Sequence, residues 1–283
     1  MDIADQKKLL HGITIPPCPA ILSQLMAEIK SPLVNNKKIA ALIRQDVGIA
    51  AAVIRTANSP LIGGGRITSI TSAVGMLGFK LIANLVNEAL LRSAIDTHGA
   101  SLERFWDSSR YTAIAAKRLA NVVGRVNADT AYTFGLFHDC GIPLLTQRYP
   151  EYKSILREAN QDTRQIFTDI EESALGTSHA VLGYYLARTW GLADAVTQGI
   201  LNHHDYAQLE DPRNIHSEAH RLIALNVMAE IVASTHLRTV QDGEWRKARE
   251  AVSVCLGYTP TDLDDIIDDM VYQFDEALNH AEN

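Results

Sequence analysis

Apolar residues recur at helical spacing along almost the whole chain. The stretch SHAVLGYYLARTWG is typical, because it places Val181, Leu182, Tyr185 and Leu186 on one stripe, the spacing of an amphipathic helix. No persistent alternation of apolar and polar residues between turn signals is found, and such alternation would indicate β-strands. The pattern therefore predicts an all-α fold.

Capping residues and helix breakers predict where several helices begin and end. Asp46 has the position of an N-cap for the helix VGIAAAVIRTA, and Asn58 follows that helix. For both residues we favour capping and side-chain-to-backbone hydrogen bonds over a functional role. Gly78 predicts a turn between two helical segments. Gly141 predicts the end of the helix that precedes it.

Breaks in the pattern predict two helical lobes with a segment at either end. We expect a lead-in segment over 1–15, an N-terminal lobe over 16–100, a second lobe over 101–240 and C-terminal helices over 241–283. The last segment carries an acidic tail, since eight of the 33 acidic residues and no Lys or Arg occur from Thr261 onward. Its apolar stripe predicts an amphipathic helix that packs on the body or docks on a partner protein.

Composition narrows the class of protein. The 283 residues are 47% hydrophobic and 21% charged, which indicates a globular core. The net charge of -7 argues against a nucleic-acid-binding protein. We expect a cytoplasmic location with no membrane contact, because no apolar stretch approaches a bilayer span and the first residues lack a secretory apolar run. The three cysteines form no CxxC pair, and Cys140 is better explained as a small buried residue than as a nucleophile.

Histidines and a carboxylate recur at helix ends in the second lobe. His138-Asp139 ends one helix, His179 opens another and His203-His204 ends a third. Imidazole binds Zn, Fe, Ni or Cu, a carboxylate can bridge two ions, and such a site could activate water for attack on phosphorus. The simpler interpretation stays open, because an HD pair arises by chance and a histidine at a helix C-terminus is favoured by the helix dipole.

The order of these motifs resembles a known family. LFHDCG, then SHAVLGYYLARTWGL, then ILNHH is similar to the HD superfamily of metal-dependent phosphohydrolases. The earlier blocks IPPCPAILSQLMAEI, ALIRQDVGIAAAVIRTANSP and ITSITSAVGMLGFKLIANLV, with FWDSSRYTAIAAKRLA, resemble the HDOD family, the HD-related output domains of bacterial signalling. The resemblance covers roughly residues 12–240 and implies a two-lobed helical HDOD domain whose second lobe is HD-like.

The resemblance implies a set of metal ligands for a divalent Fe, Mn, Zn or Ni ion. The matching positions are His138, Asp139, His179, His203 and His204, with Glu230 as the nearest match for a final aspartate and Asn226, one turn earlier, as a weaker candidate. Asp139 would bridge two ions or orient the attacking water if the site were active. Counting from Phe105-Trp106, the first metal histidine of the family falls on Ser108, and a serine is a poor ligand.

Two functions follow, and we favour the first because a lost ligand weakens metal affinity. The first is a non-catalytic signal-transduction output module that binds a signalling protein or a small effector. The second is a metal-dependent phosphohydrolase acting on nucleotides or phosphodiesters. A third alternative is purely structural, with His138 and Asp139 paired to fix the second lobe.

Overall fold

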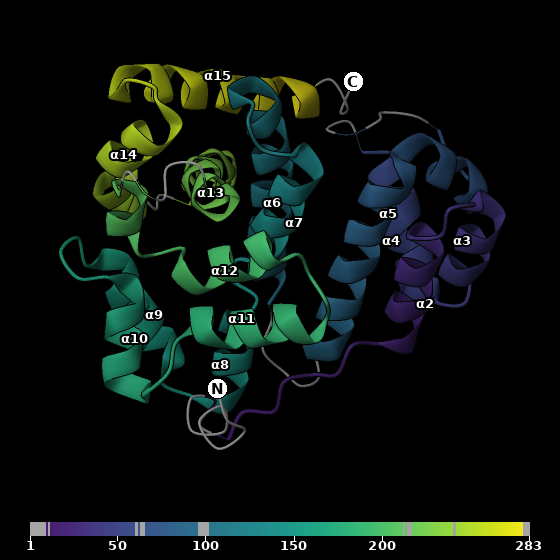
Figure 1. Ribbon diagram of the computed structural model, residues 1–283, viewed down its shortest axis with the longest axis horizontal. Helices are drawn as coiled ribbons and strands as arrows, with labels where there is room; N and C mark the ends of the chain where they lie inside the picture. Colours follow the sequence, from purple (N-terminus) through teal and green to yellow (C-terminus); the bar gives the residue numbers. More distant parts are fainter. Residues whose placement is uncertain are drawn as a thin grey trace. The chain divides into compact units, whose positions relative to one another are not determined.

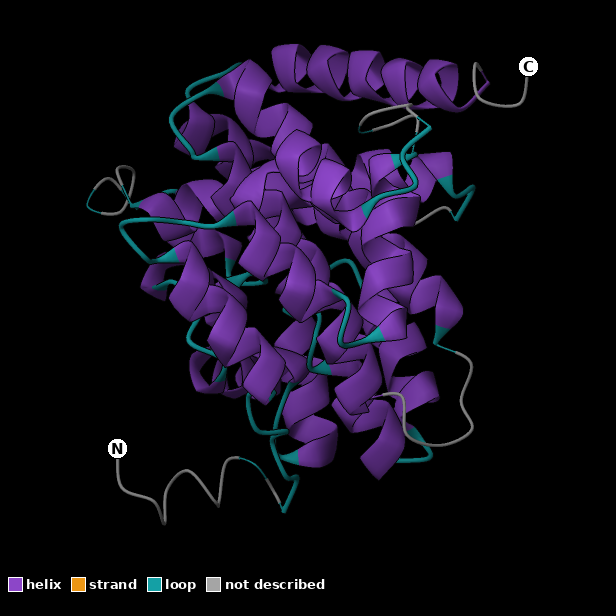
Figure 2. Cartoon of the chain, turned by 90° about the vertical axis from the view of Figure 1, so that its right-hand side faces the viewer, coloured by secondary structure: helices purple, strands orange, loops and turns teal. Residues whose placement is uncertain are grey.

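The computed structural model describes residues 10, 12–59, 62, 66–95, 102–211, 213, 217–239 and 242–279. The predicted lead-in over 1–15 lies mostly outside these residues. Helices and loops make up the described part of the chain, which contains no strand (Figure 2). The prediction of an all-α fold is confirmed. The chain divides into two compact units, Pro17–Gly99 with Tyr272–Asn283, and Ala100–Val271 with Met1–Pro16.

Within its described residues, the unit that begins at Pro17 has four helices before residue 96. These are α2 (Ala20–Ile29), α3 (Asn36–Ile43), α4 (Val47–Ala57) and α5 (Ile70–Ile95). Asp46 caps α4, since its carboxylate accepts a hydrogen bond from the Ile49 amide at 3.0 Å. The Asn58 amide donates to the Ile67 carbonyl at 2.8 Å, and its oxygen accepts from the Ile67 N–H at 2.7 Å. Both side chains therefore make the hydrogen bonds to the backbone that the sequence predicts.

Helix α5 is interrupted at Gly78. This residue has φ of 74° and ψ of 161°, outside the helical region, so two helical segments meet there. Glycine adopts a positive φ at little cost, which explains the predicted turn. By length and composition alone α5 has the properties of a membrane-crossing helix, but 61% of its most apolar window is buried inside the structure. A core helix of a folded lobe passes the same test.

The unit that begins at Ala100 holds the rest of the helices (Figure 1). They are α6 (Glu103–Val123), α7 (Ala128–Phe137), α8 (Ile142–Arg148), α9 (Tyr152–Gln161), α10 (Phe167–Leu175), α11 (His179–Thr189), α12 (Asp194–Asn202), the short 3-10 helix η1 (Tyr206–Leu209), α13 (Glu218–His236), α14 (Gly243–Leu256) and α15 (Pro260–Asn279), whose last turns belong to the other unit. Helix α13 packs against both α6 and α7, and α12 packs against α7, α11 and α13. This packing brings the ends of α7, α11 and α12 together.

Gly141 lies between α7 and α8 and has a role that its sequence position does not reveal. Helix α7 ends at Phe137, four residues before Gly141, whose φ of -79° is one that any residue can adopt. Instead, a Cβ built on Gly141 would lie 2.0 Å from the carbonyl oxygen of His179, at the start of α11. Only glycine permits this close approach of two backbones.

The acidic C-terminal helix packs on the protein through its apolar stripe. Leu263, Ile267 and Met270 are buried, and Asp264 pairs with Arg249 of α14 through two contacts, one of them 3.1 Å long. The remaining acidic residues of this helix include exposed positions such as Asp265 and Asp268. Cys140 is fully buried, as expected for a small core residue, and burial raises the pKa of its thiol.

Candidate metal centre

The six side chains that the sequence singles out meet in the unit that begins at Ala100. Three helix ends and one helix interior supply them: the C-terminal end of α7, the first residue of α11, the C-terminal end of α12 and the middle of α13. The residues are His138, Asp139, His179, His203, His204 and Glu230, and contacts of 3.1–3.3 Å connect all of them.

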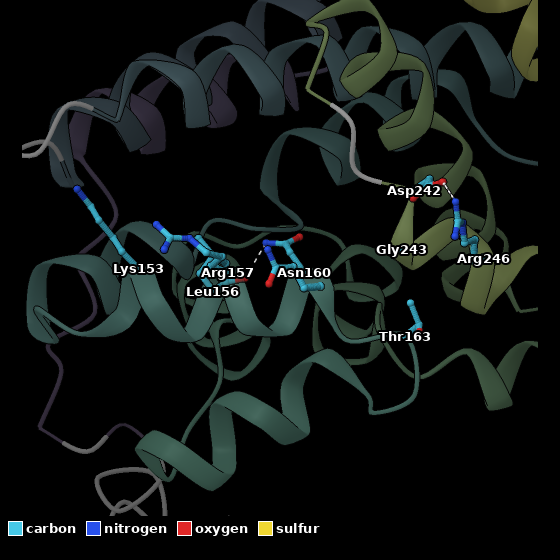
Figure 3. A pocket seen from close by; sticks show the side chains of 9 residues that line it. Lys153, Leu156, Arg157, Asn160, Thr163, Asp242, Gly243 and Arg246 are labelled. Atoms are coloured by element: carbon cyan, nitrogen blue, oxygen red, sulfur yellow. Dashed lines mark hydrogen bonds and ion pairs between the residues drawn. The ribbon is translucent and has the colours of Figure 1, made fainter.

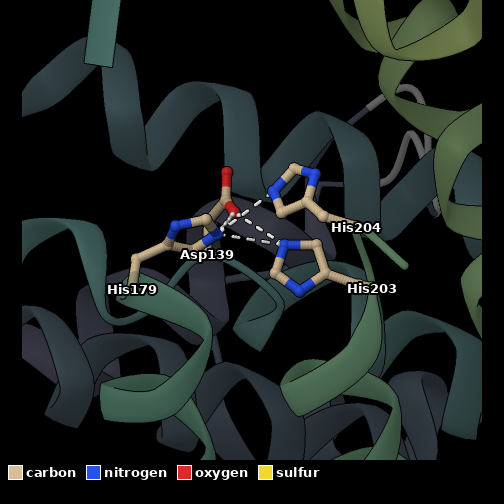
Figure 4. A group of neighbouring side chains, drawn as sticks. All are labelled: Asp139, His179, His203 and His204. Carbon is tan, nitrogen blue, oxygen red and sulfur yellow. Dashed lines mark hydrogen bonds and ion pairs between the residues drawn. The ribbon is translucent and has the colours of Figure 1, made fainter. Parts of the chain in front are cut away.

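The compact centre of this group consists of three imidazoles and one carboxylate. Oδ1 of Asp139 lies 3.3 Å from Nε2 of His179 and 3.3 Å from Nε2 of His203. One ligand atom from each of Asp139, His179, His203 and His204 lies within 4.8 Å of the others (Figure 4). We call these four residues the histidine cluster. Three nitrogens and one oxygen at this spacing are the donor set of a four-coordinate zinc-type site.

Asp139 also faces a second, smaller group of donors. Its Oδ2 lies 3.3 Å from Nε2 of His138, and that nitrogen is 3.1 Å from Oε1 of Glu230. The side-chain amide of Asn226, one turn earlier on α13, donates to the same Glu230 oxygen at 2.6 Å. The two oxygens of Asp139 therefore point to two different donor sets.

The imidazole of His138 and the three imidazoles of the histidine cluster are each fixed through Nδ1 by an oxygen acceptor of the protein. The bonds run from His138 to the Gly135 carbonyl (2.9 Å), from His203 to the Ile200 carbonyl (2.7 Å), from His179 to Glu171 (2.6 Å) and from His204 to Glu244 (2.8 Å). Because these oxygens accept, each Nδ1 carries a proton, and a neutral ring then presents the lone pair of Nε2 to the centre of the site. Metal-ligating histidines are oriented in this way.

The Nε2 lone pairs of the three clustered histidines point toward one another, so a positive charge between them is needed to offset their repulsion. Nε2 of His179 lies 3.1 Å from Nε2 of His203 and 3.3 Å from Nε2 of His204. Two lone pairs at this distance repel each other unless a proton or a metal ion lies between them. A divalent cation satisfies all three nitrogens together, so the donor set fits a metal ion.

The charges of the metal-free cluster agree with this requirement. Burial opposes protonation of His179, but the carboxylates of Glu171 and Asp139 outweigh it and raise its pKa to about 10. Burial, assisted by the electrostatic influence of the neighbouring His204, lowers the pKa of His203 to about 3. One proton on His179 therefore satisfies the lone pair of His203 when no ion is present. Metal binding would displace that proton.

Glu171 is the main support of His179. It is fully buried on α10 and accepts hydrogen bonds from the backbone N–H of His179 (3.1 Å), from its Nδ1 and from the hydroxyl of Tyr152. Phe167, one turn earlier on α10, stacks on the ring of His204 with 4.5 Å between centroids and 9° between planes. Helix α10 thereby holds two of the three imidazoles.

Glu244 is the corresponding support of His204. It belongs to the first turn of α14 and also accepts hydrogen bonds from the Tyr206 hydroxyl (2.7 Å) and from Lys247 (2.7 Å). Burial would raise the pKa of Glu244, but its hydrogen bond with His204, the electrostatic influence of that histidine and the hydrogen bonds from Lys247 and Tyr206 lower it to about 2. Sequence reasoning missed Glu171 and Glu244, because neither belongs to a motif or a recognisable spacing.

Solvent reaches one edge of the site and not the other. The rings of His179, His203 and His204 are buried, with at most 8% of any of these residues exposed. The side chains of Asp139 and Glu230 are 28% exposed. Solvent therefore reaches the carboxylate edge of the site, while the imidazole edge is closed.

The position expected for a further histidine needs a correction. Ser108 on α6 is exposed, so it does not face the interior. Its neighbour Ser109 is 2% exposed. A Cβ built on Gly135 of α7 would lie 2.9 Å from the backbone of Ala113 on α6, so these two helices pack closely here. Of the two serines, Ser109 faces the interior of the protein and Ser108 does not.

The fold and the site together define an all-helical domain with a histidine–carboxylate centre able to hold a metal ion. The sequence profile of the HDOD domain family matches residues 15–206. The chain therefore belongs to the HDOD domain family. An uncharacterised protein of Treponema pallidum (strain Nichols) is 29% identical over 195 residues, which is 68% of this chain and 38% of the relative. The chain thus spans well under half of that protein's length.

Solved structures share the fold. An HDOD domain protein from Geobacter sulfurreducens has a TM-score of 0.69 at 24% identity, covering 98% of this chain and 99% of the other. A Marinobacter aquaeolei protein, provisionally named as a signal transduction protein, has a TM-score of 0.72 at 24% identity, covering 99% of this chain and 65% of the other. A Shewanella amazonensis protein, provisionally named as a phosphohydrolase, has a TM-score of 0.68 at 22% identity, covering 93% and 94%.

Proposed function

We propose that this chain is a regulatory module of bacterial signal transduction that acts in the cytoplasm by binding rather than by hydrolysis. Its histidine cluster would hold one divalent ion, and its partner would be a signalling protein or a small effector. Membership of the HDOD family and the name of the Marinobacter protein support a signalling role.

The closed donor set of the histidine cluster carries this proposal. Structural zinc sites use four protein ligands, whereas catalytic sites keep one coordination position for water or substrate. His179, His203 and His204 with Asp139 would supply four ligands, and the three imidazoles are buried. A bound ion would link the ends of α7, α11 and α12 and would supply structural order rather than an activated water.

A turnover assay tests the proposal. The protein would be purified without a histidine tag, stripped of metal, reloaded in turn with Zn, Mn, Fe or Ni, and assayed on nucleotides and phosphodiesters. We expect retained metal and no hydrolysis above that of Asp139→Asn. Hydrolysis that requires Asp139 in any of the four loaded forms would contradict the proposal.

A second function, metal-dependent phosphohydrolysis, is favoured by one observation. The two oxygens of Asp139 face separate donor sets, one with His179 and His203 and the other with His138 and Glu230. A shared carboxylate of this kind can bridge two ions. Asp139 would then orient the attacking water at the exposed carboxylate edge. Two tightly bound ions per chain would support this second function.

A further inference from the structure

A cavity of about 520 Å³ lies in the same unit, between α9 and the first turn of α14 (Figure 3). Lys153, Arg157 and Asn160 line it from α9, and Thr163 follows that helix. Gly243 and Arg246 of α14 line the opposite wall, next to Asp242. None of these residues belongs to the histidine cluster, and the proposed function makes no use of them.

The cavity is cationic. Asp242 is its acidic residue and is already paired with Arg246 at 2.5 Å. Lys153 and Arg157 lie four residues apart on α9 and are both exposed, and no ion pair connects either of them to a described residue. Like charges at this spacing destabilise a helix. An anion bound between the walls would relieve that repulsion.

We propose that this cavity binds a small phosphorylated ligand and transmits its presence to the histidine cluster. The volume is in the range of small-molecule sites. Guanidinium groups match phosphate oxygens, and Arg157 and Arg246 stand on opposite walls. The first turn of α14 adds backbone N–H groups that no side-chain cap occupies.

Both walls of the cavity also support the cluster. On α9, Tyr152 precedes Lys153 and donates its hydroxyl proton to Glu171, the acceptor for His179. On α14, Glu244 follows Gly243 and accepts the hydrogen bond of His204. A ligand that shifts either wall therefore displaces a carboxylate that orients an imidazole.

The walls have little room to move independently. A Cβ built on Gly243 would lie 3.0 Å from the carbonyl oxygen of Asn160, so the start of α14 touches the end of α9. Lys247 strengthens the connection, because its ammonium donates to the Gln165 carbonyl at 2.9 Å and to Glu244 at 2.7 Å. Movement at the cavity is thus passed directly to Glu244.

The binding test uses the full chain in its metal-free form, with inorganic pyrophosphate and ATP as probes in calorimetric titrations. We expect one saturable site whose affinity falls with ionic strength. The double variant Lys153→Glu/Arg157→Glu should weaken binding at least about tenfold. The control Lys37→Glu/Arg104→Glu changes two exposed basic residues elsewhere and should match the wild type. No saturable binding of either probe, or equal binding by both double variants, would overturn the site.

The coupling test reads the imidazole ¹⁵N signals of His204, assigned with His204→Asn. Adding pyrophosphate should shift these signals in the wild type and in the control, but not in Lys153→Glu/Arg157→Glu. Unchanged signals at saturating probe would overturn the coupling. The regulatory meaning of this coupling rests on the proposed function. Both measurements use metal-free protein, however, so a failure of ion binding does not affect them.

Discussion

Nε2 of His179 and Nε2 of His203 lie 3.1 Å apart, although Nδ1 of each ring is already committed to an oxygen acceptor. The two nitrogens come from the start of α11 and the end of α12. Such an approach is stable only with a proton or a cation between the rings. The cluster is therefore assembled around a positive charge. The stability of the protein should change when a metal ion replaces the proton as that charge.

Removing metal should lower the thermal stability of the protein. A ligand that binds only the folded state at one hundred times its dissociation constant contributes about 2.7 kcal/mol. Thermal unfolding of zinc-loaded protein with and without a chelator should show a lower Tm after chelation, restored by excess zinc. In His203→Ala the chelator should leave the Tm unchanged. An equal shift in that variant would place the ion elsewhere.

Replacing Glu171 with Gln should weaken metal binding about 10- to 100-fold, the usual cost of losing a support of a ligating histidine. The neutral amide holds the Nδ1 proton of His179 less strongly and leaves a less basic Nε2. Competition titrations with a metal indicator would measure the loss.

Glu172→Gln is the matched control for that titration. Glu172 is the next residue on α10, is exposed and accepts a hydrogen bond from Ser178. The Glu172→Gln variant should bind metal as the wild type does. Equal affinities for the wild type and Glu171→Gln would show that Glu171 does not support the site.

Replacing Gly141 with Ala should destabilise the protein by about 1–3 kcal/mol or more, the range for inserted atoms in a packed core. The new methyl group would overlap the His179 carbonyl and push α11 away from the end of α7. Urea denaturation would measure the free energy of unfolding. Gly75→Ala, at an exposed helical position with open space, should instead stabilise by about 0.5–1 kcal/mol. An unchanged free energy of unfolding in Gly141→Ala would contradict the close approach of Gly141 to the His179 carbonyl.

Replacing Asn58 with Asp should destabilise the unit that begins at Pro17 by about 1–3 kcal/mol. The carboxylate keeps the shape of the amide but cannot donate to the carbonyls of Ile54 and Ile67. Asn36→Asp, on the exposed first turn of α3, is the control and should have little effect. Equal free energies of unfolding for Asn58→Asp and the wild type would show that these hydrogen bonds from Asn58 do not stabilise the unit.

The sequence predicts the helical fold and the main donors because both leave local signals. Helical periodicity, the caps at Asp46 and Asn58 and the break at Gly78 depend on neighbours in the chain. The histidines at helix ends stand out because of their residue type. Helix ends from separate parts of the chain then meet in the fold, which periodicity alone does not require.

The supports of the site could not be predicted because they depend on tertiary packing. Glu244 is forty residues from His204, and nothing in its surroundings distinguishes it from other surface-type glutamates. Gly141 has the sequence context of a helix end, but its function is a backbone contact with His179. The exposed Ser108 shows a related problem, since counting along the sequence does not reveal which side chains of a helix face the interior.

Metal stoichiometry tests the central claim most directly. Protein purified without a histidine tag and dialysed against Zn, Mn, Fe or Ni would be examined by elemental analysis, with anomalous diffraction to locate the ion. The account predicts about one ion per chain, bound by His179, His203, His204 and Asp139. Fewer than about 0.1 ions per chain with every metal, or an ion bound elsewhere, would contradict it.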